Sequence, residues 1–221
     1  MRGRAGCVKI PPMEASPPFP VRFELEGWDL FWVHVESVPG QEEALAALRR
    51  TTSERARSRF EPESLSSHPT VAAMRGLFRA AGCDPTRYRP SSEALLRRVL
   101  KGEDLPAIHP LVDLNNCLSV ELAVPSCVAG EGTFAPPVVL RAGRAGESYE
   151  SLRGPFNLEG KPLLADAEGP FSSPITDSQR VKVREGMGRA WMVAYLPRGV
   201  VTPEAVRSAL DGLLAAIGAS R

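Results

Sequence analysis

The sequence has 221 residues, of which 43% are hydrophobic and 24% charged, and its formal net charge is +1. This length can bury a substantial core and favours one domain, whereas the near-neutral charge argues against a protein that coats nucleic acid through bulk electrostatics. No apolar run approaches the ~20 residues that span a bilayer. Residues 1–20 lack the apolar stretch of a secretory signal, so we expect a soluble cytoplasmic protein without a membrane partner.

The cysteines and histidines do not form the pattern of a metal site. Cys7, Cys83, Cys117 and Cys127 lie far apart, and the sequence has neither a CxxC pair nor the Cys/His spacing that binds zinc. A chain with this much hydrophobic material does not need a disulfide framework, so a reducing compartment is the better interpretation. We expect no metal and no cofactor.

The N-terminal half is predicted to contain two strands followed by four helices. Residues 1–20 are rich in proline and small residues and are expected to form a disordered tail, with one domain over residues 21–221. Ser91 or Ser92 is placed to cap the third helix, and Pro110 to open the fourth. The predicted strands are 21–25 and 29–37, and the predicted helices are 41–60, 68–81, 92–101 and 110–122.

After Pro125 the pattern changes to short strand candidates separated by turns. These candidates are 138–141, 163–165, 180–184 and 190–196. A last amphipathic helix is predicted to end near Ile217, with Thr202 as its N-cap and Pro203 at its first position. Helices before strands, with one closing helix, indicate the α+β class rather than repeated βαβ units.

Several blocks of sequence resemble a known family. They are PSSEALLRRVLKG, LPAIHPLVDLNNCLSVELAVPS, VVLRAGRAGESYESL, LLADAEGP, ITDSQRVKV and AWMVAYLP, which together with their spacing cover roughly residues 20–215. The chain resembles stand-alone B3/B4 domain proteins, which are similar to the editing domain of the phenylalanyl-tRNA synthetase beta subunit. The resemblance implies an α+β, B3/B4-type fold with a β-sheet sandwich core, helices mainly in the N-terminal half and one C-terminal helix.

The same resemblance implies a pocket for an aminoacyl group or a free amino acid, and a tRNA or aminoacyl-tRNA partner. In the synthetase this domain hydrolyses tyrosine wrongly attached to phenylalanine tRNA. At three polar positions of that pocket this chain has a different residue: Cys127 where the synthetase has a histidine, Pro106 where it has an arginine, and Val193 where it has a glutamate. Pro125 is the same in both. The hydrolytic chemistry therefore does not transfer with the fold.

Two functional interpretations stay open. One is tRNA-linked quality control, in which the protein binds an aminoacyl ester and, if it is an enzyme, hydrolyses it in trans. The other is a non-catalytic binding module for an amino-acid-like small molecule, tRNA or a protein. A hydrolase that uses Cys127 with His109 is the weakest candidate, because nothing in the sequence brings the two together.

The candidate substrate-binding residues come from the best-matching half of the chain. We expect Asp113, Asn116, Cys127 and Arg141 to border one concave site, although polar groups on a buried helix also serve to satisfy nearby backbone. The full candidate set is Asp113, Asn115, Asn116, Pro125, Cys127, Arg141 and Glu147.

A basic stretch is the candidate RNA-binding surface. Its arginines would contact phosphates and its tyrosine would stack on a base, whereas a solvated helix face is the competing interpretation. The residues are Arg87, Tyr88, Arg89, Arg97 and Arg98.

Overall fold

The structure is a computed structural model that describes residues 19–36 and 40–218. Residues 1–18 of the predicted tail lie outside the described residues. Phe19, the first described residue, contacts the rings of Trp32 and Trp191 edge-on, with centroids 5.1 and 5.5 Å away. In the described ranges, no helix has the length and apolar character needed to cross a membrane.

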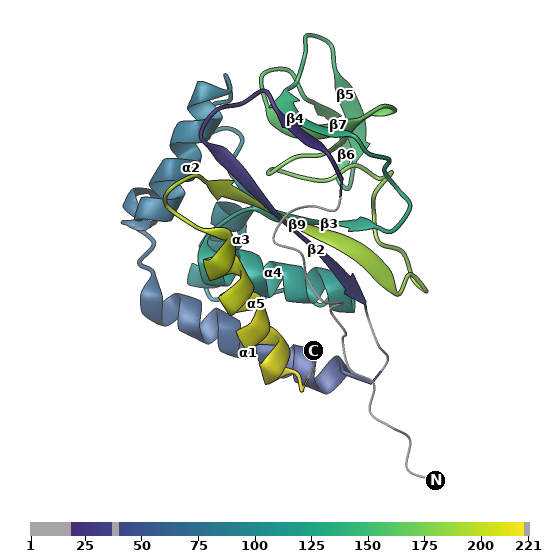
Figure 1. The fold of residues 1–221 in the computed structure, drawn as a ribbon. Helices are drawn as coiled ribbons and strands as arrows, with labels where there is room; N and C mark the ends of the chain where they lie inside the picture. The colour runs from purple at the N-terminus through teal and green to yellow at the C-terminus, as the bar shows by residue number, and fades with distance from the viewer. Residues whose placement is uncertain (1–18, 37–39, 219–221) are drawn as a thin grey trace.

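A layer of helices covers one face of a three-stranded antiparallel sheet (Figure 1). The sheet has the order β2-β9-β3. Its longest strand pair, β2 with β9, therefore joins residues that are far apart in the sequence. The strands are β2 (Trp28–Glu36), β9 (Arg189–Pro197) and β3 (Ser126–Gly130). The helices are α1 (Glu42–Arg59), α3 (Ser91–Leu100), α4 (Pro110–Leu122) and α5 (Pro203–Ala216).

A second sheet faces the other side of the first one. It has the order β1-β4-β7-β8, and the hairpin of β5 and β6 packs on its outer face. The strands are β1 (Val21–Phe23), β4 (Val138–Ala142), β7 (Pro162–Asp166), β8 (Gly169–Ser172), β5 (Ser148–Ser151) and β6 (Gly154–Asn157). Helix α2 (Pro69–Ala80) follows the short 3-10 helix Leu65–Ser67 and closes one side of the sandwich.

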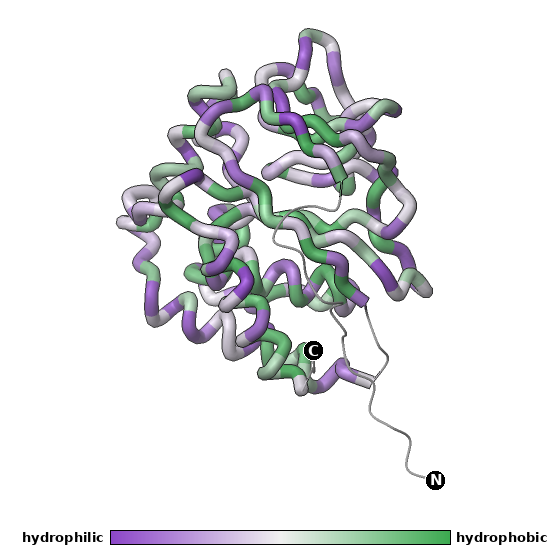
Figure 2. Tube along the Cα trace, in the orientation of Figure 1, coloured by the Kyte–Doolittle hydropathy of each residue, from purple (hydrophilic) through white to green (hydrophobic). Residues whose placement is uncertain are grey.

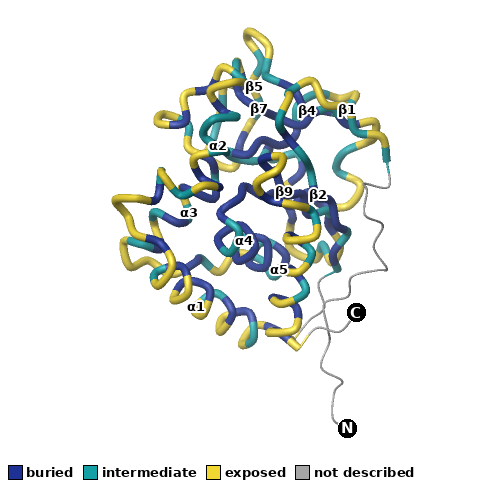
Figure 3. The backbone as a smooth tube through the Cα atoms, turned by 60° about the vertical axis from the view of Figure 1, so that its left-hand side comes forward, coloured by how far each residue is buried: buried dark blue, intermediate teal, exposed yellow. Residues whose placement is uncertain are grey.

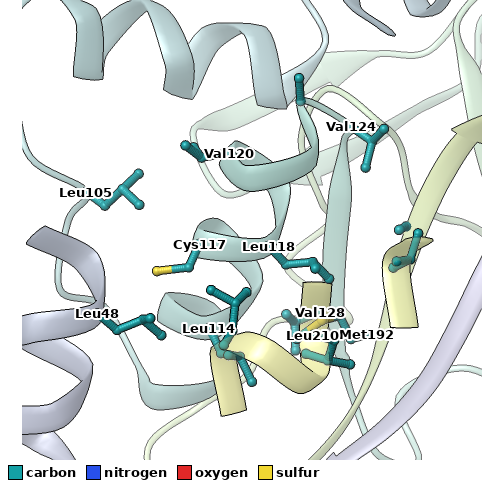
Figure 4. Packing of buried hydrophobic residues seen from close by; sticks show 14 of the residues in the cluster. Leu48, Leu105, Leu114, Cys117, Leu118, Val120, Val124, Val128, Met192 and Leu210 are labelled. Atoms are coloured by element: carbon teal, nitrogen blue, oxygen red, sulfur yellow. The ribbon is translucent and has the colours of Figure 1, made fainter. Parts of the chain in front are cut away.

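Alternation along β9 divides the core into two clusters. Met192 and Ala194 point into the helical cluster, whereas Val193 and Tyr195 point into the cluster between the sheets, as a period of two residues requires. Strand β9 is buried along most of its length because both of its faces are covered (Figure 3), and apolar residues follow it accordingly (Figure 2). Figure 4 shows the helical cluster, where Leu114, Leu118 and Leu210 meet Val128 and Met192.

The predicted α+β class with a sandwich core is confirmed, and all five predicted helices are present in the described chain. Thr202 caps α5 by accepting a hydrogen bond from the Ala205 amide at 3.2 Å, as predicted. The prediction that Ser91 or Ser92 caps α3 was wrong. Pro90 is the N-cap, and the Ser92 hydroxyl instead donates to the Ala123 carbonyl at 3.1 Å.

The strand prediction was less accurate than the helix prediction. Residues 180–184 form turns and irregular backbone rather than a strand. This segment is held by Arg180, which binds Asp166 and lies over the Phe171 ring, so side-chain contacts replace the ladder of a sheet. Strands β3, β5, β6 and β8 were not predicted, because four or five residues with Gly, Pro and Ser carry little β signal.

Candidate functional site

The predicted pocket residues do not converge on one site, because the layers of the fold separate them. Asp113 belongs to the helical layer, where its carboxylate pairs with Arg49 of α1. The same carboxylate accepts hydrogen bonds from the backbone amides of Ile108 and His109, at 2.9 and 3.3 Å. Asp113 is thus a buried cap that holds the segment leading into α4.

Asn115 also has a structural position, beneath the three-stranded sheet. Its amide donates to the Ser126 carbonyl at 3.2 Å, and the Ser126 hydroxyl donates to the Asn115 carbonyl at 3.3 Å, which joins α4 to β3. Asn116 is partly exposed on the same helix. Pro125 is buried, and its carbonyl accepts the Tyr195 amide at 2.9 Å.

Arg141 and Glu147 form an ion pair on the outer face of the second sheet. Both guanidinium nitrogens of Arg141 contact the Glu147 carboxylate at 2.7 Å, and this bidentate contact holds the pKa of Glu147 below its usual value. Gly143 belongs to the same loop, and a Cβ atom there would lie 1.9 Å from the Leu158 carbonyl oxygen. Residues 142–147 therefore form a turn that packs closely against Leu158 and is stabilised by the ion pair between Arg141 and Glu147.

Cys127 lies in the sandwich, away from the other predicted residues. It points into the cluster between the two sheets, whereas His109 caps α4 on the helical side of the three-stranded sheet. The structure therefore does not bring the thiol and the imidazole together. No group of His, Cys, Asp or Glu side chains suited to a metal is present among the described residues.

Cys127 belongs instead to a polar cluster that the sequence did not reveal. The Ser172 hydroxyl oxygen lies 2.7 Å from Asp177 Oδ1, 2.8 Å from the Tyr195 hydroxyl and 3.0 Å from the Cys127 sulfur. Ser172 has one proton to donate. Because an ionised carboxylate is the strongest of these acceptors, Ser172 donates to Asp177 and accepts from Tyr195 when Asp177 is charged. We call these four residues the polar cluster.

Burial favours the uncharged form of each titratable member of the polar cluster. Desolvation raises the pKa of Asp177 to about 7, against the hydrogen bonds from Ser172 and Cys127, which lower it. Burial also raises the pKa values of Cys127 and Tyr195 well above their usual ranges. A carboxyl group that titrates near neutral pH beside two neutral donors is a common property of functional sites.

The Asp177 end of the polar cluster lies nearest to solvent. Ser172, Cys127 and Tyr195 are at most 2% exposed, whereas Asp177 and the preceding residues Ile175 and Thr176 are partly exposed. These residues belong to the loop that follows β8, and the Tyr149 hydroxyl of β5 stabilises this loop by donating a hydrogen bond to the Thr176 carbonyl. Asp177 is therefore the member of the polar cluster that solvent reaches.

The predicted basic patch divides into a free half and a neutralised half. Arg87 and Arg89 are exposed and form no ion pair in the described part of the chain, whereas Arg97 pairs with Glu93 and Arg98 with Glu103. The segment after Arg89 contacts the loop that follows β8, because the Ser91 amide donates to the Pro174 carbonyl at 2.8 Å.

Tyr88, between the two free arginines, is already in contact with several groups. The Lys161 ammonium lies 4.0 Å from its ring centroid, the Arg87 guanidinium 5.2 Å from it, and the Phe156 ring 6.0 Å away. Little of the tyrosine ring therefore remains for stacking on a further group.

Comparison with known proteins identifies the type of domain. The family described as "B3/4 domain" matches residues 73–213. A search of the curated proteins found no match. Among solved structures, the crystal structure of an N-terminal fragment of the phenylalanyl-tRNA synthetase beta subunit from Pyrococcus horikoshii is similar, with 17% identity and a TM-score of 0.40. That similarity covers 51% of this chain and 42% of the fragment, so the chain spans less than half of it.

The polar cluster was missed because its members are separated in sequence. Ser172, Asp177 and Tyr195 come from β8, the loop after it and β9. Asp177 lies in ITDSQRVKV and Tyr195 in AWMVAYLP. Those two blocks were among the ones that resemble the family. The presence of a polar residue within such a block was the one signal in the sequence that could have pointed to the polar cluster.

Proposed function

This chain belongs to the B3/4 domain family, as its match over residues 73–213 establishes, and from that premise we propose that it binds the amino-acid end of an aminoacyl ester in tRNA quality control. The observation that carries the proposal is the position of the polar cluster. Cys127 and Val193 pair across β3 and β9, and the resemblance associates both positions with the editing pocket. The Asp177 carboxyl belongs to the same cluster as the Cys127 thiol.

The polar cluster and its surroundings supply the polar part and the apolar part of such a site. Trp32, Val193 and Cys127 form one cross-strand row on the sandwich face, and the stacked rings of Phe134 and Phe171 lie above it in the same cluster, with centroids 4.9 Å apart. Apolar walls with a few convergent polar groups are the usual composition of a small-molecule site. The rings would contact the side chain of the amino acid, and the polar cluster its ester end.

A hydrolytic role would use the Asp177 carboxyl, which lies at the partly exposed end of the polar cluster and whose pKa burial raises to about 7. A carboxylate with that pKa can accept a proton from water at neutral pH. In such a step, the water oxygen would bond to the ester carbonyl carbon while Asp177 takes its proton. The carbon–oxygen bond to the ribose would then break, and the ribose oxygen would leave with a proton.

The RNA part of the substrate would contact the free half of the basic patch. Arg87 and Arg89 precede Ser91, which contacts the loop after β8, and they have no acidic partner among the described residues. With a net charge of +1, a local patch of this kind is what RNA binding would require. We further propose a cytoplasmic setting, which the free, buried thiols of Cys83, Cys117 and Cys127 support, and a single domain over residues 21–221.

A panel of tRNAs, each charged with cognate and non-cognate amino acids, tests the proposal. Binding and ester cleavage are measured for the wild type, for Asp177→Asn and for the matched control Asp104→Asn, a surface carboxylate paired with Arg57. We expect at least one ester to bind, with binding or cleavage weakened by Asp177→Asn alone. Retention of an ester without cleavage would identify a binding module. If no ester in the panel binds or is cleaved, the proposed function is wrong.

A further inference from the structure

Three buried carboxylates elsewhere in this protein, and the partly buried carboxylate of Glu147, are paired with arginine. Four side chains illustrate the rule, each with an arginine nitrogen within 3.0 Å of a carboxylate oxygen. Such pairing is expected, because a carboxylate removed from water without a counter-charge is strongly destabilised. The four are Glu93 with Arg75, Asp113 with Arg49, Glu147 with Arg141 and Asp166 with Arg180.

Asp177 departs from this rule: the residue as a whole is partly exposed, but its carboxyl group is desolvated by burial. Within residues 19–36 and 40–218 it takes part in no ion pair, and no cation contributes to its pKa. The titratable groups that face it are the Cys127 thiol from β3, the Tyr195 hydroxyl from β9 and the Tyr149 hydroxyl from β5. Burial raises the pKa of all three, so they remain neutral at physiological pH and supply no positive charge.

The hydrogen bonds around Asp177 hold the carboxyl in place and leave acceptor capacity. Ser172 donates to Oδ1 at 2.7 Å and the Cys127 thiol also donates to the carboxylate, and these two hydrogen bonds use only part of the roughly four acceptor positions of an ionised carboxylate. The backbone of the residue is fixed on both sides, since its carbonyl accepts the Leu152 amide at 3.2 Å and the Ser178 amide donates to Phe171. The carboxyl is therefore oriented by its neighbours without being neutralised by them.

We infer that Asp177 is the binding site for a primary ammonium group of the ligand, which takes the place that an arginine fills beside the other buried carboxylates. The inference rests on the proposed function for the identity of the ligand, which would be the α-ammonium of an aminoacyl ester or of a free amino acid. It adds a selectivity: the site distinguishes a free α-amine from an acylated one, such as a peptidyl or N-acetylated group. An acylated nitrogen carries no charge to pair with the carboxylate.

Charge pairing also sets the pH dependence of binding. An ammonium group binds the ionised carboxylate, so affinity should rise as the pH increases towards about 7, where Asp177 loses its proton, and should fall again above ~8, where an α-ammonium loses its own proton. The bound cation should in turn lower the pKa of Asp177, because an opposite charge in contact favours the ionised form. The Asp177 carboxyl would then be more fully ionised when the site is occupied than when it is empty.

The test observes the Asp177 carboxyl directly in the intact protein by NMR with carboxyl-labelled aspartate, assigned through Asp177→Asn. The probes are amino acid amides with small, branched and aromatic side chains, each compared with its N-acetylated counterpart. We expect free-amine probes to shift the Asp177 resonance and to bind about tenfold or more tightly than the acetylated ones, a ratio that corresponds to ~1.4 kcal/mol. Asp177→Asn should remove this preference, and the control Asp104→Asn should keep it.

The outcomes separate the inference from the proposed function. If no free-amine probe moves the Asp177 resonance, or if Asp177→Asn keeps the preference, the inference is wrong. If the amides bind at Asp177 but no aminoacyl-tRNA binds, the ammonium site stands and the tRNA-linked function fails. If aminoacyl-tRNA binds equally with free and acetylated amines, the function stands and the ammonium site fails.

Discussion

Cys127 on β3 and Val193 on β9 lie directly opposite each other, and both side chains are buried between the two sheets. By resemblance, these are two polar positions of an editing pocket. Here burial raises the pKa of the Cys127 thiol well above its usual value, so the thiol stays neutral, and valine has no polar group at all. At these two positions the face of the sheet is therefore uncharged and buried.

The first prediction is that the protein clears tyrosyl-tRNA(Phe) slowly or not at all. A phenol hydroxyl buried against Val193 would lose its hydrogen bond to water without a replacement, which costs about 1–3 kcal/mol. Deacylation of tyrosyl-tRNA(Phe) is measured beside a panel of other aminoacyl esters. Rates like those of a synthetase would contradict the prediction. If they survived Cys127→Ala, the thiol would also be excluded as their source.

The second prediction concerns stability and pH. The folded state raises the pKa of Asp177 from 3.8 to about 7, so the folded protein binds this proton more tightly than the unfolded chain. The stability from this group is fully present below pH ~4, declines as the pH rises and is lost above ~7. Asp177→Asn should remove the decline, at ~1.4 kcal/mol per unit of pKa shift. Urea unfolding of both proteins across this range measures it, and parallel pH profiles would refute it.

The third prediction separates Arg141 from ligand binding. Arg141 is 6% exposed and its two contacts with Glu147 are 2.7 Å long. Arg141→Met should destabilise the fold by about 2 kcal/mol, because it leaves a partly buried carboxylate without its partner. Arg141→Met combined with Glu147→Gln should recover part of the loss. Ligand binding at the polar cluster should be unchanged in the folded double variant, and a specific loss of binding there would restore Arg141 to the site.

The fourth prediction divides the basic patch. Arg87→Gln with Arg89→Gln should weaken tRNA binding and reduce its salt dependence, because these two arginines have no acidic partner in the described chain. Arg98→Gln is the matched control, since Arg98 is already neutralised by Glu103. Filter binding over a range of salt concentrations measures both. An equal loss from the control would show that the surface acts through overall charge.

The sequence by itself determined the elements whose signals are local. Helical periodicity, Pro110 and Pro203 at first helical positions and Thr202 as a cap identified α4 and α5, because these signals act within one or two turns of chain. Long apolar strands such as β9 were equally visible. The family was also available from sequence, because it depends on blocks of residues in a fixed order.

Only the tertiary structure decided which polar residues share a site. Asp113 and Asn115 stand close to Cys127 in sequence, yet a sheet lies between them and the thiol, because successive residues of a strand point to opposite faces. Asp177, fifty residues after Cys127, meets it across the sandwich. The charge state of Asp177 depends on burial and on the absence of a nearby cation in the described chain. Both are properties of packing between distant segments, which no local pattern encodes.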